Sequence, residues 1–320
     1  MTLHELHTTP DRAGNLAVLP PRRERLAIIS TRNTLCGIAA YTQALERQLA
    51  ELFEITVFDL DQYLLRSEHP RVRALGDRHI REICRDIAGF DAVNLQLEFG
   101  TLGRSAKDIE RRFGWLVGAP KRLSVTFHTL TPVPVFPVLD FVRAAATLKW
   151  REAADIKSAF LRNRRLSLGV ARRLRQAQQR KPVSVIVHNR RDLSDARHLH
   201  GFERVFDHPL CFLSADDAAA ISASATRRRF IQLDPLPREA KLIGVFGFLN
   251  TYKGFGAVVR ALHHLPDDHH LLIFGATHPN EIPLRSTIHP YVASLLDDAQ
   301  STQRSTIICA IQPQSASTSI

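Results

Sequence analysis

Short apolar runs alternate along this chain with segments in which apolar residues recur every three or four positions. The recurring segments predict helices over residues 37–51 and 71–87. The runs predict strands at 26–30, 55–59, 92–96, 123–127 and 183–187. Strands that alternate with helices favour a doubly wound sheet of mostly parallel strands, in which helices cover both faces.

The same alternation restarts after a segment with two prolines, Asp234-Pro-Leu-Pro237, which is typical of an inter-domain linker. Strands are predicted at 242–246, 271–274 and 306–309, and helices at 255–265 and 291–296. We therefore expect an α/β protein with two Rossmann-like doubly wound lobes that face a cleft. The expected parts are a flexible leader at 1–24, a first lobe at 25–232, a linker at 233–240, a second lobe at 241–310 and a loose tail at 311–320.

The second lobe is short for its class, because doubly wound domains usually have about 100–150 residues. We expect it to be incomplete. The composition is that of an ordinary globular protein, with 44% hydrophobic and 23% charged residues. No apolar run predicts a membrane-spanning helix, and the polar N-terminus lacks the apolar core of a secretory signal. The four cysteines are scattered and form no Cys-x-x-Cys pair, which favours free thiols in a reducing cytoplasm.

The net charge of +11 draws attention to residues 149–181, where arginines interleave with apolar residues. This pattern predicts one or two amphipathic basic helices. One hypothesis is docking on an anionic membrane surface. The alternative is a solvated helix whose apolar side packs on the first lobe. A nucleic-acid surface is disfavoured, since aromatic residues make up 7% of the chain and no recognised binding module is present.

Polar residues follow the predicted strands of the first lobe. They include Gly37 in a loop that opens a helix, then Glu98, His128 and His188 after three later strands. Ligands of open α/β sheets bind outside the carboxyl ends of the strands. We therefore expect these residues to converge on one edge of the sheet, although each of them alone could be structural.

Three other patterns suggest sites that we do not favour. Asp59 lies about 20 residues past Gly37, as the ribose-binding acid of a nicotinamide site would, but the three-glycine turn of such sites is missing. Asp59-Leu-Asp61 matches a short metal-binding string and is interpreted as a strand end. The four histidines at 263, 264, 269 and 270 are interpreted as an exposed helix end and turn rather than a metal site.

The second lobe has a sharper motif, in which a strand runs into Gly247-Phe-Leu-Asn-Thr-Tyr-Lys-Gly254 and then a helix. Gly247 lets the backbone approach a ligand. Lys253 is expected near the helix N-terminus, where its charge and free N–H groups suit a diphosphate. A second loop, Gly275-Ala-Thr-His-Pro-Asn280, is expected beside it.

Together these residues resemble the family 4-type GT-B glycosyltransferases over about residues 26–296. The resemblance includes Cys-Gly-Ile-Ala-Ala-Tyr-Thr42, Gln96-Leu-Glu-Phe-Gly100, the strand that ends in His128 and the Gly-Val-Phe-Gly-(x)5-Lys-Gly pattern. Phe274-Gly-Ala-Thr-His-Pro279 is similar to bacterial members that build polysaccharides.

The resemblance implies transfer of a sugar from a nucleotide-sugar donor to a glycan or lipid-linked acceptor, with retention and without a required metal or other cofactor. Together with the cysteine usage and the basic segment, this leads us to expect a cytoplasmic enzyme, with peripheral attachment at the inner face of the plasma membrane as an open alternative. The catalytic residues would be His128 and Lys253. The implied donor-binding residues are Gly247, Lys253, Gly254, Gly275 and His278, and the implied acceptor-binding residues are Gly37, Tyr41, Glu98 and His188.

Two departures from the family pattern motivate an alternative. Phe248 stands where many members carry arginine, and no Glu-(x)7-Glu motif follows residue 296. The alternative hypothesis is therefore a catalytically inactive, truncated homologue that acts as a binding or membrane-associated partner.

Overall fold

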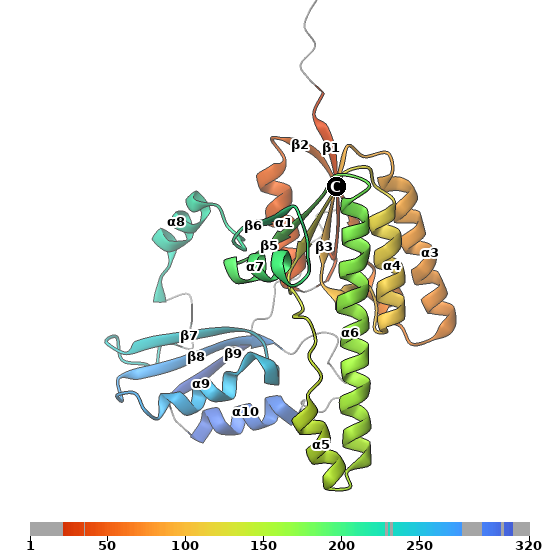
Figure 1. Cartoon of the computed structure of the whole chain (residues 1–320). Helices are drawn as coiled ribbons and strands as arrows, with labels where there is room; N and C mark the ends of the chain where they lie inside the picture. The colour runs from red at the N-terminus through yellow and green to blue at the C-terminus, as the bar shows by residue number, and fades with distance from the viewer. Residues whose placement is uncertain are drawn as a thin grey trace, which may run out of the picture. The chain divides into compact units, whose positions relative to one another are not determined.

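The computed structural model describes residues 22–34, 36–227, 230, 233–276, 290–301 and 304–309. The chain divides into two compact units, Met1–Ser214 and Ala215–Ile320. Most of the expected leader and the whole expected tail lie outside the described residues. Figure 1 shows each unit as a sheet with helices packed on it.

The first unit is built on a six-stranded sheet in which all neighbouring strands are parallel, in the order β2-β1-β3-β4-β5-β6. Its strands are β1 (Glu24–Ser30), β2 (Phe53–Asp59), β3 (Ala92–Leu97), β4 (Leu123–Phe127), β5 (Val183–Val187) and β6 (Val205–Asp207). The strand order reverses between β1 and β3. The loops that follow these two strands therefore diverge, which is where doubly wound sheets bind ligands.

Helices connect these strands. They are α1 (Gly37–Leu49), α2 (Gln62–Arg66), α3 (Pro70–Ile87), α4 (Ala106–Gly118), α5 (Val138–Ala146), α6 (Trp150–Gln178) and α7 (Arg190–His198), with a short 3-10 turn, η1 (Phe99–Thr101), after β3. Because parallel crossovers are right-handed, α3, α4, α6 and α7 cover one face of the sheet and α1 covers the other.

The two faces of this sheet differ in chemistry. The main core joins apolar residues of α3, α4, α6 and α7 to alternate strand residues such as Leu95, Val125 and Val185. The intervening positions on the α1 side include buried polar residues, among them Gln96 and Thr126. Side chains of a strand alternate between faces, so a polar layer lies beneath α1.

A buried arginine ties α3 and α4 together. Arg112 is fully buried, and its Nε donates a 2.8 Å hydrogen bond to Oδ1 of Asp77. Its Nη1 donates to the carbonyl oxygens of Leu65 and Leu102, both at 2.8 Å. A buried charge is tolerated only when it is paired and hydrogen-bonded. This network therefore fixes the helices that support β3 and the loop after it.

Helix α6 is one continuous helix over most of the basic segment 149–181. Its second half is an ordinary covering helix, because Val170, Ala171 and Leu174 are buried in the main core. Arg165 and Arg173 pair with Glu110 of α4, at 3.1 and 3.5 Å. This packing is what the solvated-helix alternative predicted for that part of the segment. The membrane hypothesis for the rest stays a prediction.

The second unit has a three-stranded parallel sheet in the order β7-β8-β9. Its elements are α8 (Ala215–Ser224), β7 (Lys241–Phe248), the 3-10 turn η4 (Thr251–Lys253), α9 (Phe255–Leu262), β8 (His269–Ala276), α10 (Pro290–Ser301) and β9 (Ser305–Cys309). Apolar residues of α9, α10 and the central strand β8 form its core. Leu233, in the expected linker, is buried against Leu272 of β8.

Candidate functional site

The carboxyl ends of β3, β4 and β5 bring polar side chains to one edge of the first sheet, as the sequence predicted. His128 follows β4 and His188 follows β5, and their ring centroids are 5.3 Å apart. Both continue the alternation of their strands onto the face that α1 covers. The two histidines therefore form one cluster, although they are far apart in sequence.

His128 is held by a chain of buried amides. Its Nε2 lies 2.8 Å from Oε1 of Gln96, and Nε2 of Gln96 donates to Oδ1 of Asn94. Asn94 in turn donates to the hydroxyls of Ser124 and Thr126, at 2.8 and 3.1 Å. Because the Gln96 amide nitrogen is used on Asn94, its oxygen faces His128, so Nε2 of His128 carries the hydrogen and Nδ1 keeps a lone pair.

Burial lowers the pKa of His128 to about 4, with a smaller contribution from the neighbouring His188. The ring is therefore neutral at pH 7. A neutral imidazole with this pKa accepts a hydrogen bond from a hydroxyl at Nδ1 but is a weak base. The arrangement suits the orientation of a sugar hydroxyl better than proton abstraction.

Tyr41 covers both histidines from α1. It is buried and makes edge-on contacts with His128 at 5.5 Å and with His188 at 5.6 Å between ring centroids. Burial raises the pKa of its phenol, and the nearby Cys211 adds to this. Phe212, in the loop after β6, contacts the third side of Tyr41 at 6.0 Å. An aromatic cage thus surrounds the histidine pair.

His188 contributes an unsatisfied nitrogen to this cage. Its Nδ1 lies 3.0 Å from the carbonyl oxygen of His208, so Nδ1 donates and Nε2 is the acceptor. Nε2 is buried and has no hydrogen-bond partner. Buried polar atoms of this kind are rare in native proteins and are often completed by a ligand or a water.

Glu98 lies at the end of β3, at the point where the strand order reverses. Its Oε2 accepts a 2.9 Å hydrogen bond from the hydroxyl of Thr129, the residue after His128. Burial raises the pKa of Glu98, although this hydrogen bond and the backbone N–H groups of Phe99 and Gly100 oppose the shift. The bond joins the loops after β3 and β4.

Gly37 opens α1 with free space where a side chain would be, since a Cβ built there meets nothing within 4 Å. The cap of the helix is Cys36, whose Sγ accepts from the N–H of Ala39 at 3.4 Å. Asp59 holds the loop before it by accepting from the N–H of Arg32 and the amide of Asn33, at 2.7 and 3.0 Å. This structural role of Asp59 agrees with its interpretation as a strand end.

The three glycines predicted to bind the donor have different structural roles. Gly247 (φ 142°) and Gly254 (φ 74°) have positive φ values, which only glycine adopts readily. A Cβ on Gly247 would lie 3.8 Å from Cε of Lys253, so the lysine stem passes over this glycine. Gly254 is the N-cap residue of α9, and a Cβ built on it would meet no atom within 4 Å. Lys253 thus lies at the N-terminus of α9, as predicted.

Gly275 has a packing reason to be glycine. It pairs with Gly247 across β7 and β8, and a Cβ there would come within 2.4 Å of Cδ2 of Leu249. Its predicted donor contact stays a prediction. His278, the remaining residue of that set, lies outside the described residues.

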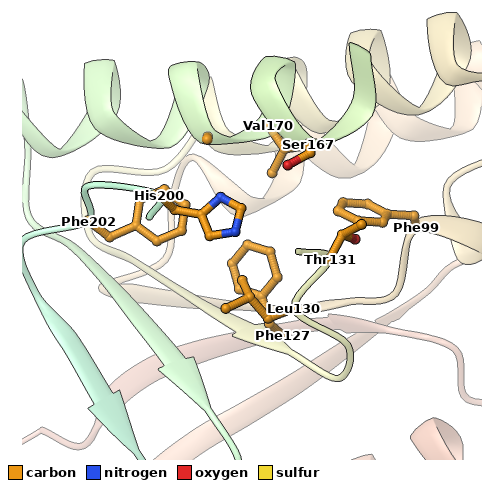
Figure 2. A pocket seen from close by; sticks show the side chains of 9 residues that line it. Phe99, Phe127, Leu130, Thr131, Ser167, Val170, His200 and Phe202 are labelled. Carbon is orange, nitrogen blue, oxygen red and sulfur yellow. The ribbon is translucent and has the colours of Figure 1, made fainter. Parts of the chain in front are cut away.

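A small cavity lies on the opposite face of the first sheet, between β4 and α6. Figure 2 shows Ser167 and His200 turned toward this space, with Phe99, Phe127 and Phe202 around it. Ser167 Oγ and His200 Nε2 are both buried without a hydrogen-bond partner. The volume of about 10 Å³ has room for roughly one water molecule. It is therefore too small for a sugar.

The described residues contain no group of three or more His, Cys, Asp or Glu side chains placed to hold a metal ion. His270 lies 2.9 Å from the hydroxyl of Thr306, and His269 lies 2.7 Å from Asp268. Among the described residues, no helix is both long enough and apolar enough to cross a membrane.

Phe212 and the unsatisfied nitrogen of His188 are site features that the sequence did not predict. Phe212 follows β6, which has only three residues and too few apolar positions to be recognised as a strand. The alternation of polar residues along β3 and β4 was a usable signal for the polar layer, because Asn94, Gln96, Thr126 and His128 occupy every second position.

No protein-family model and no curated protein matches this sequence. Solved structures similar to it include HepE from Anabaena in complex with UDP and glucose, at 11% identity and a TM-score of 0.50, covering 91% of this chain and 70% of HepE. HepE in complex with UDP-glucose matches with the same identity and coverage and a TM-score of 0.49. A UDP-glucosyltransferase from Polygonum tinctorium matches at 14% identity and a TM-score of 0.42, covering 92% of this chain and 72% of the enzyme.

The first of these likenesses, together with the two parallel sheets, shows the fold. The chain has the α/β GT-B fold with two Rossmann-like units, as the sequence predicted.

Proposed function

We propose that this chain is a retaining glycosyltransferase that moves a sugar from a nucleotide-sugar donor to a glycan or lipid-linked acceptor in polysaccharide synthesis. The proposal is supported by the likeness in fold to HepE, whose crystals contain UDP and glucose. It is also supported by the positions of Glu98, His128 and His188, which directly follow parallel strands, because such folds bind ligands at the carboxyl ends of their strands.

The observation that carries the proposal is the loop between β7 and α9. Gly247 lies at the end of β7, and the stem of Lys253 passes over it. The loop ends at Gly254, where α9 begins. An ammonium group beside a helix N-terminus stabilises the charge that develops on a diphosphate leaving group. Lys253 is therefore the proposed phosphate-binding residue.

The cage in the first unit supplies the proposed acceptor side. His128 is fixed as a neutral ring by Gln96, and its Nδ1 would accept a hydrogen bond from a sugar hydroxyl. His188 offers an unsatisfied Nε2 in the same cage. Glu98 and Gly37 border this site in the proposal. A weakly basic His128 fits a reaction with retention, in which the enzyme need not deprotonate the acceptor strongly.

Calorimetric titration with UDP-glucose, GDP-mannose and ADP-glucose tests donor binding. Lys253→Ala is expected to weaken binding of the preferred donor by about tenfold or more, because a charge-assisted contact to phosphate is lost. Arg260→Ala is the matched control, since Arg260 is an exposed cation in the last turn of α9. No binding of any nucleotide sugar, or equal losses in both variants, would contradict the proposal.

A second candidate is a homologue that binds without turnover. The residue after Gly247 is Phe248, which adds no charge to the phosphate site. Donor binding together with no detectable transfer to any acceptor would favour this candidate, whereas measured sugar transfer by the chain excludes it. The proposed reaction uses no metal ion, so EDTA is expected to leave transfer unchanged.

A further inference from the structure

Helix α5 is apolar around most of its circumference, and Asp140 and Arg143 are its only charged residues. One side is packed, because Ala144 is buried and Phe141 contacts Phe136, which in turn contacts Phe160 of α6. The other side is open to solvent. Its exposed apolar residues are Val138 (56%), Leu139 (86%) and Val142 (55%). Helices that are apolar on all sides are normally buried.

The turn between α5 and α6 adds two larger apolar side chains. Leu148 has φ 56°, and the next N–H, of Lys149, donates to the carbonyl oxygen of Ala144 at 2.9 Å. This is the helix-ending turn in which glycine or asparagine usually takes the left-handed position. Here that position carries a leucine that is 72% exposed, followed by Trp150 at 64%. Leucine is unfavourable in this conformation, and no packing inside the described chain accounts for it.

Positive charge surrounds these apolar residues. Between residues 138 and 164 the chain has six basic and three acidic side chains, for a net charge of +3. The basic ones are Arg143, Lys149, Arg151, Lys157, Arg162 and Arg164. Tryptophan next to cations, beside an exposed apolar helix face, is the composition of a segment that lies in a membrane interface.

The two halves of α6 differ in their surroundings. Toward its C-terminus the helix is covered, and Arg165 and Arg173 pair with Glu110. Toward its N-terminus it supports α5, and Figure 1 shows the two helices forming a hairpin that extends beyond the first sheet. An extended hairpin with an apolar tip can reach a flat surface without obstruction from the sheet that carries it.

We propose that the hairpin tip, defined as residues 138–151, docks on a membrane surface that contains anionic lipids. Leu139, Leu148 and Trp150 enter the boundary between headgroups and acyl chains, and Lys149 and Arg151 contact lipid phosphates. Lys149 pairs with Glu152 at 3.2 Å, whereas Arg151 is exposed and residues 138–151 carry a net charge of +2. This positive charge favours an anionic lipid surface over a neutral apolar protein groove. The inference is independent of the proposed sugar transfer, since it concerns where the protein is held.

The test uses the fluorescence of Trp150 in the full chain. The sequence has two tryptophans, so Trp115→Phe leaves Trp150 as the only one. Vesicles of phosphatidylcholine and phosphatidylglycerol in equal amounts are expected to shift its emission to the blue and to co-sediment the protein. Vesicles of phosphatidylcholine alone are expected to do neither, and salt is expected to weaken binding.

Two variants with matched controls locate the surface. Leu148→Asn removes apolar area and suits the left-handed turn, so a loss of binding would not reflect misfolding; the expected loss is about tenfold. Arg151→Gln is expected to weaken binding about fivefold. The controls are Leu52→Asn, at a residue 65% exposed after α1, and Arg47→Gln in the last turn of α1. Both controls should bind within about twofold of the parent.

Three results would overturn the inference. One is the absence of binding to anionic vesicles, and another is equal binding by the tip variants and their controls. The third is a blue-shifted Trp150 emission without lipid that disappears on dilution, which would assign the tip to contact between two copies of the chain. Donor binding measured without lipid is unaffected by any of these results, so failure here and failure of the proposed function are distinguishable.

Discussion

Nε2 of His128 lies 2.8 Å from Oε1 of Gln96, a side chain that is itself buried. Gln96 is committed on its other side to Asn94. The amide therefore presents its oxygen to the imidazole and fixes the neutral tautomer. Protonation of His128 would place a positive charge in a desolvated cage beside His188. Burial therefore lowers the pKa of His128 to about 4.

This relationship predicts a pH dependence of stability. A histidine in the unfolded chain is protonated below its pKa of about 6.5, whereas the folded His128 is protonated only below about pH 4. The free energy of unfolding should therefore be highest above about pH 6.5. It should fall as the pH drops to 4, by up to about 3 kcal/mol from this group. Urea unfolding between pH 4 and 7.5 measures the slope.

His128→Gln is the control for that slope, because glutamine does not titrate. The difference in stability between the parent and this variant is expected to shrink, or to reverse in favour of the variant, as the pH falls from 6.5 to 4. Parallel profiles for the two proteins would show that His128 titrates normally in the folded state.

Much of the fold followed from the sequence because strand runs and helix periods are local signals. Each strand predicted from the sequence coincides with an observed strand to within two residues, and α1, α3, α9 and α10 are confirmed. The strand β6 was missed, because three residues give no period. Helix α4 was missed although Ile109, Phe113 and Leu116 have helical spacing.

The candidate site was predictable only in part. The rule that ligands bind at carboxyl strand ends brought His128 and His188 to one edge. It did not predict that Tyr41 would lie between their rings and Phe212, because that contact depends on how α1 packs on the sheet. Helix α5 was missed for a related reason: the left-handed position after it is occupied by Leu148, where sequence rules look for glycine or asparagine.

The ion pair between the partly buried Asp77 and the fully buried Arg112 predicts a large loss of stability from a single change of charge. Burial alone would raise the pKa of Asp77, but hydrogen bonds from Arg111 and Arg112 outweigh it and hold the pKa below its usual value. Asp77→Asn leaves Arg112, which is fully buried, without its counter-charge. The expected cost is about 3 kcal/mol in the free energy of unfolding, measured by urea denaturation at pH 7.

Glu68→Gln is the surface comparison, because the ion pair of Glu68 with Arg104 is exposed on both sides. It should change stability by less than about 1 kcal/mol. The lowered pKa of Asp77 also sets a direction with pH. The contribution of Asp77 to the free energy of unfolding is complete above its unfolded pKa of about 4. This contribution is lost as the pH falls through the lower pKa of the folded state. Equal effects of the two substitutions would contradict this account.

Gly275 should be intolerant of a side chain for reasons of packing. A Cβ there would lie 2.4 Å from Cδ2 of Leu249, which is buried, and 3.1 Å from the carbonyl oxygen of Gly247. Gly275→Ala is expected to destabilise the protein by about 1–3 kcal/mol. Gly256→Ala in the first turn of α9 is the control, and it should be neutral or slightly stabilising. Thermal unfolding of the two variants compares them directly.

The ring of Tyr41 is expected to exclude water from the imidazole of His128. Its ring contacts those of His128 and His188 edge-on, and the low pKa of His128 arises first from burial. Tyr41→Ala should admit water, raise the pKa of His128 toward 6.5 and lower stability by about 3 kcal/mol. Tyr41→Phe preserves the ring and should leave that pKa low. An NMR titration of the imidazole C–H signals separates the two variants. A His128 pKa that stays near 4 in Tyr41→Ala would mean that Gln96 and His188, rather than the aromatic cover, keep the ring neutral.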